Sequence, residues 1–135
     1  MAPTTALKPE DVMVGLLACV SQKTGARFEA DPISLHPQFF EWRGKAEYSQ
    51  LFGEFIFDTR DYFPFSETLD SVLDGLQFAG YLERTNPRGT WYQITPAVGS
   101  LFESEIKSRF GESQLKALEA LAGEFVARIK TDPPR

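Results

Sequence analysis

The sequence predicts a mainly helical domain that contains one small β-hairpin. Apolar residues recur at helical spacing in several segments, and capping residues or prolines stand where those segments begin. Two short stretches rich in β-branched and aromatic residues flank a turn that contains Pro and Gly, as in a hairpin. With 135 residues, of which 42% are hydrophobic, the chain has the length of one domain and can bury a core without disulfides or metals.

The first half of the chain predicts two helices joined by an irregular connection. Pro9 suits the first position of a helix, and the apolar residues after it recur at helical spacing as far as Gly25. Residues 28–44 contain two prolines and no clear period, so we expect an irregular connection with room for a short helical turn. Residues 45–57 predict the second helix. Its buried face would consist of Tyr48, Leu51, Phe52 and Phe55.

A third helix is predicted from Ser66 to Gly80, because Ser66 can cap its first turn and Gly80 can end it. Its buried stripe is Leu69, Val72, Leu73 and Leu76. The opposite, exposed face holds Glu67, Ser71, Asp74 and Phe78. No Lys or Arg lies between Phe65 and Glu83, so this face is acidic. Phe78 would suit a protein-binding anchor if exposed, and could equally pack under the hairpin or against the last helix.

Residues 81–85 and 90–95 predict the two strands of the hairpin, with its turn at residues 86–89. Arg84 and Arg88 lie on and beside this turn, where they could reach a phosphate or an acidic partner, or remain solvated. Trp91 can pack at the edge of the core or offer a stacking surface. These three residues are the candidates for contact with DNA.

Two further helices follow the hairpin. Thr95 and Pro96 predict the start of a helix that runs to Gly111. Residues 113–130 predict a last helix, about 27 Å long, with an apolar seam at heptad-like spacing. The seam consists of Leu115, Leu118, Ala122, Phe125 and Ile129. Such a seam needs a partner helix, so we expect it to form the interface of a homodimer.

The order of these elements carries a resemblance to a known family. "SETLDSVLDGLQFAGYLE" followed by "WYQITPAVGSLFE" resembles the third helix, the wing strands and the closing Thr-Pro element of bacterial winged helix-turn-helix proteins. The resemblance implies a winged helix, here with an extra C-terminal helix. "YFPFSETLDSVLDGLQFAGYLE" is also similar to a stretch of Panacea-type antitoxin domains, although Phe63 stands where their motif has Gly.

The domain organisation follows from this comparison. Residues 9–110 would form the winged-helix domain, and residues 111–130 the dimerisation helix. Residues 1–8 and 131–135 offer little to dock on the core, so we expect flexible ends.

Resemblance to winged helices implies DNA binding through the third helix, but the charge of this sequence opposes it. The chain has a net charge of −5, and nucleic-acid affinity depends on Lys and Arg. We therefore expect a regulatory or protein-interaction subunit that binds an unidentified protein through its third helix. The alternative is a transcriptional regulator whose hairpin contacts DNA through Arg84 and Arg88.

Other functional classes find little support in the sequence. His36 is the only histidine, and no second His or Cys completes a metal set or a nucleophile pair, so we expect neither an enzyme nor a cofactor. The single Cys19 rules out an intrachain disulfide and fits a small buried residue in a cytoplasmic protein. The apolar run around it has nine residues, against the roughly 20 that a membrane span needs.

Overall fold

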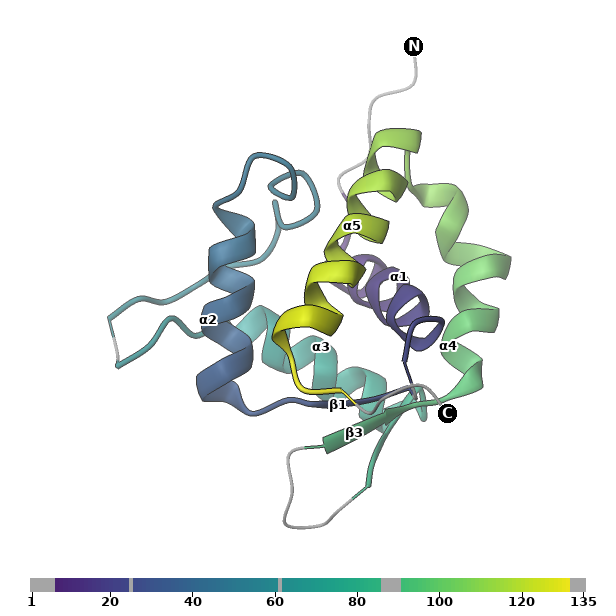
Figure 1. The fold of residues 1–135 in the computed structure, drawn as a ribbon, viewed down its shortest axis with the longest axis horizontal. Helices are drawn as coiled ribbons and strands as arrows, with labels where there is room; N and C mark the ends of the chain where they lie inside the picture. The colour runs from purple at the N-terminus through teal and green to yellow at the C-terminus, as the bar shows by residue number, and fades with distance from the viewer. Residues whose placement is uncertain (1–6, 25, 61, 86–90, 132–135) are drawn as a thin grey trace.

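The computed structural model describes residues 7–24, 26–60, 62–85 and 91–131, and it confirms the mainly helical class (Figure 1). The α-helices of this part are α1 (Pro9–Ser21), α2 (Pro32–Arg43), α3 (Glu67–Phe78), α4 (Pro96–Leu101) and α5 (Glu112–Arg128). The strands are β1 (Arg27–Glu29), β2 (Leu82–Arg84) and β3 (Trp91–Ile94). None of the described helices has the length and apolar character that crossing a membrane requires.

The sheet has one strand more than the sequence predicts. The predicted hairpin strands pair antiparallel as β2 and β3, with Leu82 opposite Ile94. β1 adds to the other edge of β3, with Phe28 opposite Tyr92, so the strand order is β1-β3-β2. β1 escapes prediction because its three residues are too few to show an alternating period. The predicted turn at 86–89 lies outside the described residues.

The expectation of an irregular connection over residues 28–44 is wrong, because α2 occupies most of it. Asp31 caps this helix by accepting a hydrogen bond from the Ile33 N–H, and Pro32 occupies its first turn, where proline's missing N–H costs nothing. Pro37 is accommodated farther along the helix. One of the two prolines that suggested a break therefore starts the helix instead.

The expectation of a helix over residues 45–57 is also wrong, although its predicted buried residues are correct. This segment is a series of tight turns, in which Tyr48, Leu51 and Phe55 each donate a backbone N–H to the carbonyl three residues earlier. Tyr48, Leu51, Phe52 and Phe55 are all buried. Successive three-residue turns bring the same positions inward as a helix does, so the spacing alone cannot distinguish the two.

Helix α1 lies at the centre of the fold, between α5 and α4 (Figure 1). Every residue from 11 to 20 is buried. Cys19, as expected, is among them, with its Sγ 3.5 Å from Glu119 Oε1 of α5. A methyl group on Gly15 would stand 2.7 Å from Leu118 Cδ2, so the glycine allows α5 to approach α1 closely.

The apolar seam of the last helix packs inside its own chain, so its prediction as a dimer interface is wrong. Leu118, Ala122, Phe125 and Ile129 are buried, and Leu115 is half-buried. The ring of Phe125 meets Phe28 of β1 and Phe39 and Trp42 of α2 at centroid distances of 5.4, 6.4 and 6.3 Å. The partner that the seam requires is supplied by α1, β1 and α2.

The helix predicted from Thr95 to Gly111 is not uniform. After α4, the chain forms a π-helical turn at Phe102–Ile106 and a 3₁₀ turn at Lys107–Arg109. Phe102, Ile106 and Phe110 still face the core. Thr95 flanks the first residue of α4, but its hydroxyl donates to the carbonyls of Gly80 and Tyr81 instead of capping the helix.

The described parts of both expected flexible ends pack on the core. Leu7 is buried, and Thr131 forms an isolated bridge with Phe28. The Glu29 N–H also donates to the Lys130 carbonyl at 2.9 Å. These contacts place Leu7 and Thr131 against the folded chain, and residues 1–6 and 132–135 lie outside the described part.

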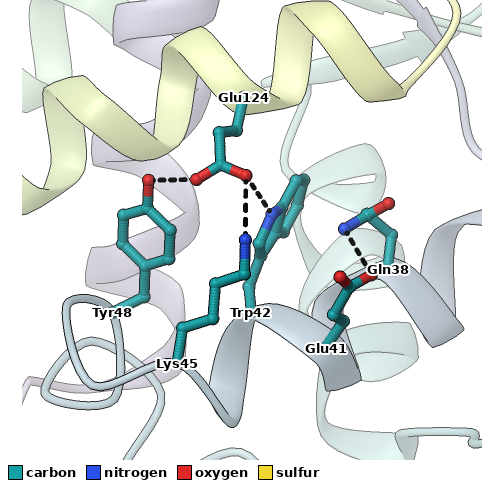
Figure 2. Close-up of polar contacts among 6 residues, drawn as sticks. All are labelled: Gln38, Glu41, Trp42, Lys45, Tyr48 and Glu124. Atoms are coloured by element: carbon teal, nitrogen blue, oxygen red, sulfur yellow. Dashed lines mark hydrogen bonds and ion pairs between the residues drawn. The ribbon is translucent and has the colours of Figure 1, made fainter.

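A carboxylate on α5 holds the turns of residues 45–57 to the helices (Figure 2). Glu124 accepts hydrogen bonds from the Tyr48 hydroxyl, from Trp42 Nε1 at 3.3 Å and from Lys45 Nζ at 3.4 Å. The Tyr48 hydrogen bond is the main cause of a lowered Glu124 pKa, and burial followed by the same contact raises the pKa of Tyr48. The irregular segment is thereby joined to both α2 and α5.

The internal position of the seam predicts the effect of a charge on α5. Leu118→Glu would bury an unpaired carboxylate against α1 and should lower the free energy of unfolding by at least about 3 kcal/mol. Ala120→Glu, on the exposed side of the same helix, should change it by less than about 0.5 kcal/mol. Thermal unfolding followed by circular dichroism compares the two. A Leu118→Glu protein that stays folded and dissociates from a dimer would contradict the internal packing.

Candidate protein-binding site

Two hydrogen bonds fix the start of α3. The Ser66 hydroxyl accepts from the Leu69 N–H at 3.1 Å, which confirms Ser66 as the cap. The Ser66 N–H in turn donates to His36 Nδ1 of α2 at 3.0 Å, and the His36 ring stacks on Phe65 with centroids 4.4 Å apart. The predicted stripe of Leu69, Val72, Leu73 and Leu76 is buried. Capping, ring stacking and burial together set which face of α3 points outward.

His36 is a neutral anchor for this helix. Its side chain is buried, and the cost of desolvating a charge lowers its pKa below the usual 6.5, against a smaller opposing effect of the Asp70 carboxylate. Because Nδ1 accepts the Ser66 N–H, the single proton of the neutral ring is placed on Nε2. Protonation of Nδ1 would remove the acceptor that holds Ser66.

The outward face of α3 is exposed as predicted. Glu67, Ser71, Asp74 and Phe78 all lie at the surface. Phe78 is 96% exposed, which excludes its alternative placement under the hairpin or against the last helix. Such full exposure of an aromatic ring leaves a large apolar area in contact with water. We refer to these four residues as the outward face.

A groove of about 560 Å³ runs beside the outward face, between α3, α1 and the segment that begins with α4. Its apolar lining is Val14, Val72, Leu76, Tyr81, Leu101 and Ile106. Along α3, the small residues Ser71, Gly75 and Ala79 form its edge. The charged side chains that line it are Lys8, Glu10, Asp11, Glu105 and Arg109. Ser71 thus belongs both to the outward face and to the groove.

One ion pair stabilises the wall of this groove. Asp11 is only 5% exposed at the start of α1, and its Oδ1 accepts from Arg109 at 2.8 Å. A buried carboxylate needs such a partner, because an unpaired buried charge is costly. The contact joins α1 to the 3₁₀ turn and fixes the spacing between two walls of the groove.

Two smaller hollows also adjoin α3. One, of about 130 Å³, is lined by His36, Asp70, Asp74 and Arg84, among others. The second, of about 450 Å³, includes Glu67 and Phe65 with the exposed Ile56. Within the described part of the chain, no three His, Cys, Asp or Glu side chains are placed to hold a metal ion.

Arg84 and Trp91, two of the predicted DNA-contact residues, do not share a surface. Arg84 is exposed, donates to the Tyr92 hydroxyl at 3.2 Å and lies over the Tyr92 ring at 5.6 Å. Trp91 is half-buried beneath the guanidinium of Arg27 at 5.6 Å. Because neighbouring residues of a strand point to opposite faces, the Arg84–Tyr92 contact and Trp91 lie on different sides of the sheet. Arg88 lies outside the described residues.

Sequence reasoning located the outward face but not the groove. Periodicity within α3 shows which side of the helix is exposed. The opposite walls come from Val14 of α1 and from Leu101 and Ile106, which are far away in the sequence. No local pattern indicates that these segments meet.

The role of His36 predicts a pH dependence of stability. In the unfolded chain His36 takes up a proton near pH 6.5, whereas in the folded chain its lowered pKa opposes protonation. The contribution of His36 to the free energy of unfolding is therefore complete above pH 6.5 and decreases as the pH falls below it. One linked proton gives a slope of at most about 1.4 kcal/mol per pH unit. Denaturant titrations between about pH 7 and 5.5 measure it. His36→Asn, whose amide oxygen can still accept the Ser66 N–H, should flatten the slope; an unchanged slope would contradict this role.

Comparison with known proteins adds no functional assignment. The sequence matches no protein-family model, and neither curated proteins nor solved structures include a significantly similar chain.

Proposed function

We propose that this chain is a winged-helix protein that binds another protein through the outward face of α3 and has no catalytic role. The order of elements supports the fold assignment, since two helices lie between β1 and β2 and the capped second of them, α3, directly precedes the hairpin. The winged-helix assignment rests on this topology and on the resemblance of residues 66–83 and 91–103.

The exposure of Phe78 is the observation that carries the proposed function. An aromatic side chain surrounded by polar residues is a typical anchor of protein interfaces, because its burial contributes much of the binding energy. Asp74 precedes it by one helical turn on the same face, and Glu67 lies near the start of the helix. An apolar anchor on a helix face that carries carboxylates and no cation favours a protein partner over a nucleic acid.

Charge disfavours the use of α3 as a DNA-reading helix. The outward face presents two carboxylates, and no cation lies between Phe65 and Glu83 to reach phosphate or guanine. Arg84 is the exposed cation nearest in sequence after this stretch, and its contacts with Tyr92 hold it to the hairpin. Contact of this part of the molecule with DNA would therefore depend on the hairpin and not on α3.

The side chains that could serve catalysis have structural partners. Nδ1 of His36 holds the Ser66 N–H. Cys19 is buried, and its burial, reinforced by Glu119, raises the pKa of its thiol to about 12. A thiol with so high a pKa is a poor nucleophile at neutral pH. These placements favour a function based on binding.

Truncation of the anchor tests the proposal. A partner enriched from a nuclease-treated lysate of the native host is purified, and its affinity is measured by isothermal titration calorimetry. Phe78→Ala should weaken binding by about 2 kcal/mol, roughly 30-fold, with little change in thermal stability because the ring is exposed. Ile33→Ala removes a 67%-exposed side chain on α2 and serves as the control. Equal effects of the two variants would reject α3 as the binding face.

The exposed Arg84 supports a second candidate, binding of DNA through the hairpin. In that case the protein should bind a promoter fragment, and Arg84→Ala should weaken binding to all sequences and reduce its salt dependence. We expect no sequence-selective binding near physiological salt, measured by fluorescence anisotropy. Sub-micromolar, sequence-selective binding that Arg84→Ala abolishes would favour DNA over a protein as the ligand.

A further inference from the structure

We infer that the groove beside α3 receives a basic amphipathic helix of a partner protein. The inference rests on the proposed function, in which α3 docks a protein, and adds the chemistry of the segment that binds. It is carried by the shape of the groove, by its apolar lining and by the charges around it.

The shape of the groove suits a helix. Ser71, Gly75 and Ala79 lie at four-residue intervals along its edge, and all three are exposed. Such small side chains let the backbone of a second helix come close to α3. The eight-residue separation from first to last corresponds to about 12 Å, or about two turns of a partner helix. The volume of about 560 Å³ gives room for several apolar side chains of that helix.

The floor and rim of the groove are complementary to an apolar stripe. Val72, Leu76 and Ile106 are buried side chains that close the floor, whereas Tyr81 and Leu101 are half-buried at the sides. A helix with apolar residues on one side would cover these half-buried atoms and remove them from water. Phe78 directly precedes Ala79 and would extend the apolar contact beyond the groove.

The charges around the groove select a basic occupant. The groove and the outward face together hold two cations, Lys8 and Arg109, and five carboxylates, Glu10, Asp11, Glu105, Glu67 and Asp74. They account for three of the five net negative charges of the chain. Arg109 is paired with Asp11, and the other four carboxylates form no ion pair within the described residues. Lys8 forms no ion pair within the described residues either, so four unpaired carboxylates stand against one unpaired cation. Lys and Arg on the polar side of a docked helix would find more partners here than the side chains of an acidic helix or a phosphate backbone.

Binding of synthetic helices to the purified full chain tests this inference. The probe is a fluorescent peptide of roughly 18 residues, made of Leu on one helical face and Lys on the other. The matched control has Glu in place of every Lys. Fluorescence anisotropy should show micromolar binding of the Lys peptide, weakened by added salt, and at least tenfold weaker binding of the Glu peptide. Absence of Lys-peptide binding, or equal binding of both peptides, would overturn the inference.

Two glycine substitutions locate the binding site. A Cβ at Gly75 meets nothing within 4 Å, and the same holds for Gly123 on α5, which does not line the groove. Gly75→Arg places bulk and a like charge in the groove and should weaken Lys-peptide binding at least tenfold. Gly123→Arg is the same substitution in α5, away from the groove. It should leave Lys-peptide binding within about twofold of the wild type, because a distant substitution has a small effect. Equal effects of the two variants would reject the groove as the site.

The outcomes also separate this inference from the proposed function. If Phe78→Ala no longer binds the native partner but Gly75→Arg still binds the Lys peptide fully, the groove is not the helix-binding site. The proposed function of α3 would stand in that case. If instead Gly75→Arg loses the Lys peptide and Phe78→Ala still binds the native partner normally, Phe78 is not the anchor. The groove would then remain supported as the helix-binding site. A neutral apolar probe that binds as tightly as the Lys peptide and is lost in Gly75→Arg would identify a small-molecule pocket and overturn the basic-helix inference.

Discussion

The enclosure of α1 is the constraint on which the rest of the structure depends. In a helix buried along ten successive residues, every side chain needs its packing and polar partners from other parts of the protein. Its buried carboxylate, Asp11, therefore requires Arg109, and its Gly15 leaves the space that Leu118 of α5 needs. Because α3, α4 and α5 all pack against this one helix, their positions relative to each other follow from its surface. The fold is stabilised by close packing around a centre and not by a covalent link.

This arrangement leaves one side of α3 available for function. The buried stripe of α3 faces the core, and the contacts among His36, Phe65 and Ser66 prevent the helix from rotating about its axis. The outward residues are thus displayed on a rigid support, which would reduce the entropy lost on binding of the proposed partner. The π-helical turn at Phe102–Ile106 contributes to the opposite wall of the groove, and such turns are frequent at functional sites.

The sequence predicted best where the structure depends on neighbouring residues. Ser66 as a cap and Gly80 as a stop are correct, since Gly80 adopts a φ of +87° that favours glycine. Prediction failed where one pattern fits two structures, as with the turns that place Tyr48 and Phe52 inward at helical spacing. It failed again for the seam around Phe125, because periodicity shows that an apolar stripe needs a partner but not whether that partner belongs to the same chain. The groove depends on tertiary contacts and leaves no local signal.

Cys19 makes the centre of the fold observable without any substitution. It is the only cysteine of the sequence, it is buried on α1, and its pKa is raised to about 12 chiefly by burial and then by the Glu119 carboxylate. An alkylating reagent reacts with an accessible thiolate, so the closed protein is protected twice, by enclosure and by protonation. Its labelling rate in the native state therefore reports how often the helix at the centre opens. The natural chain carries its own probe for the opening of the packing on which α3 depends.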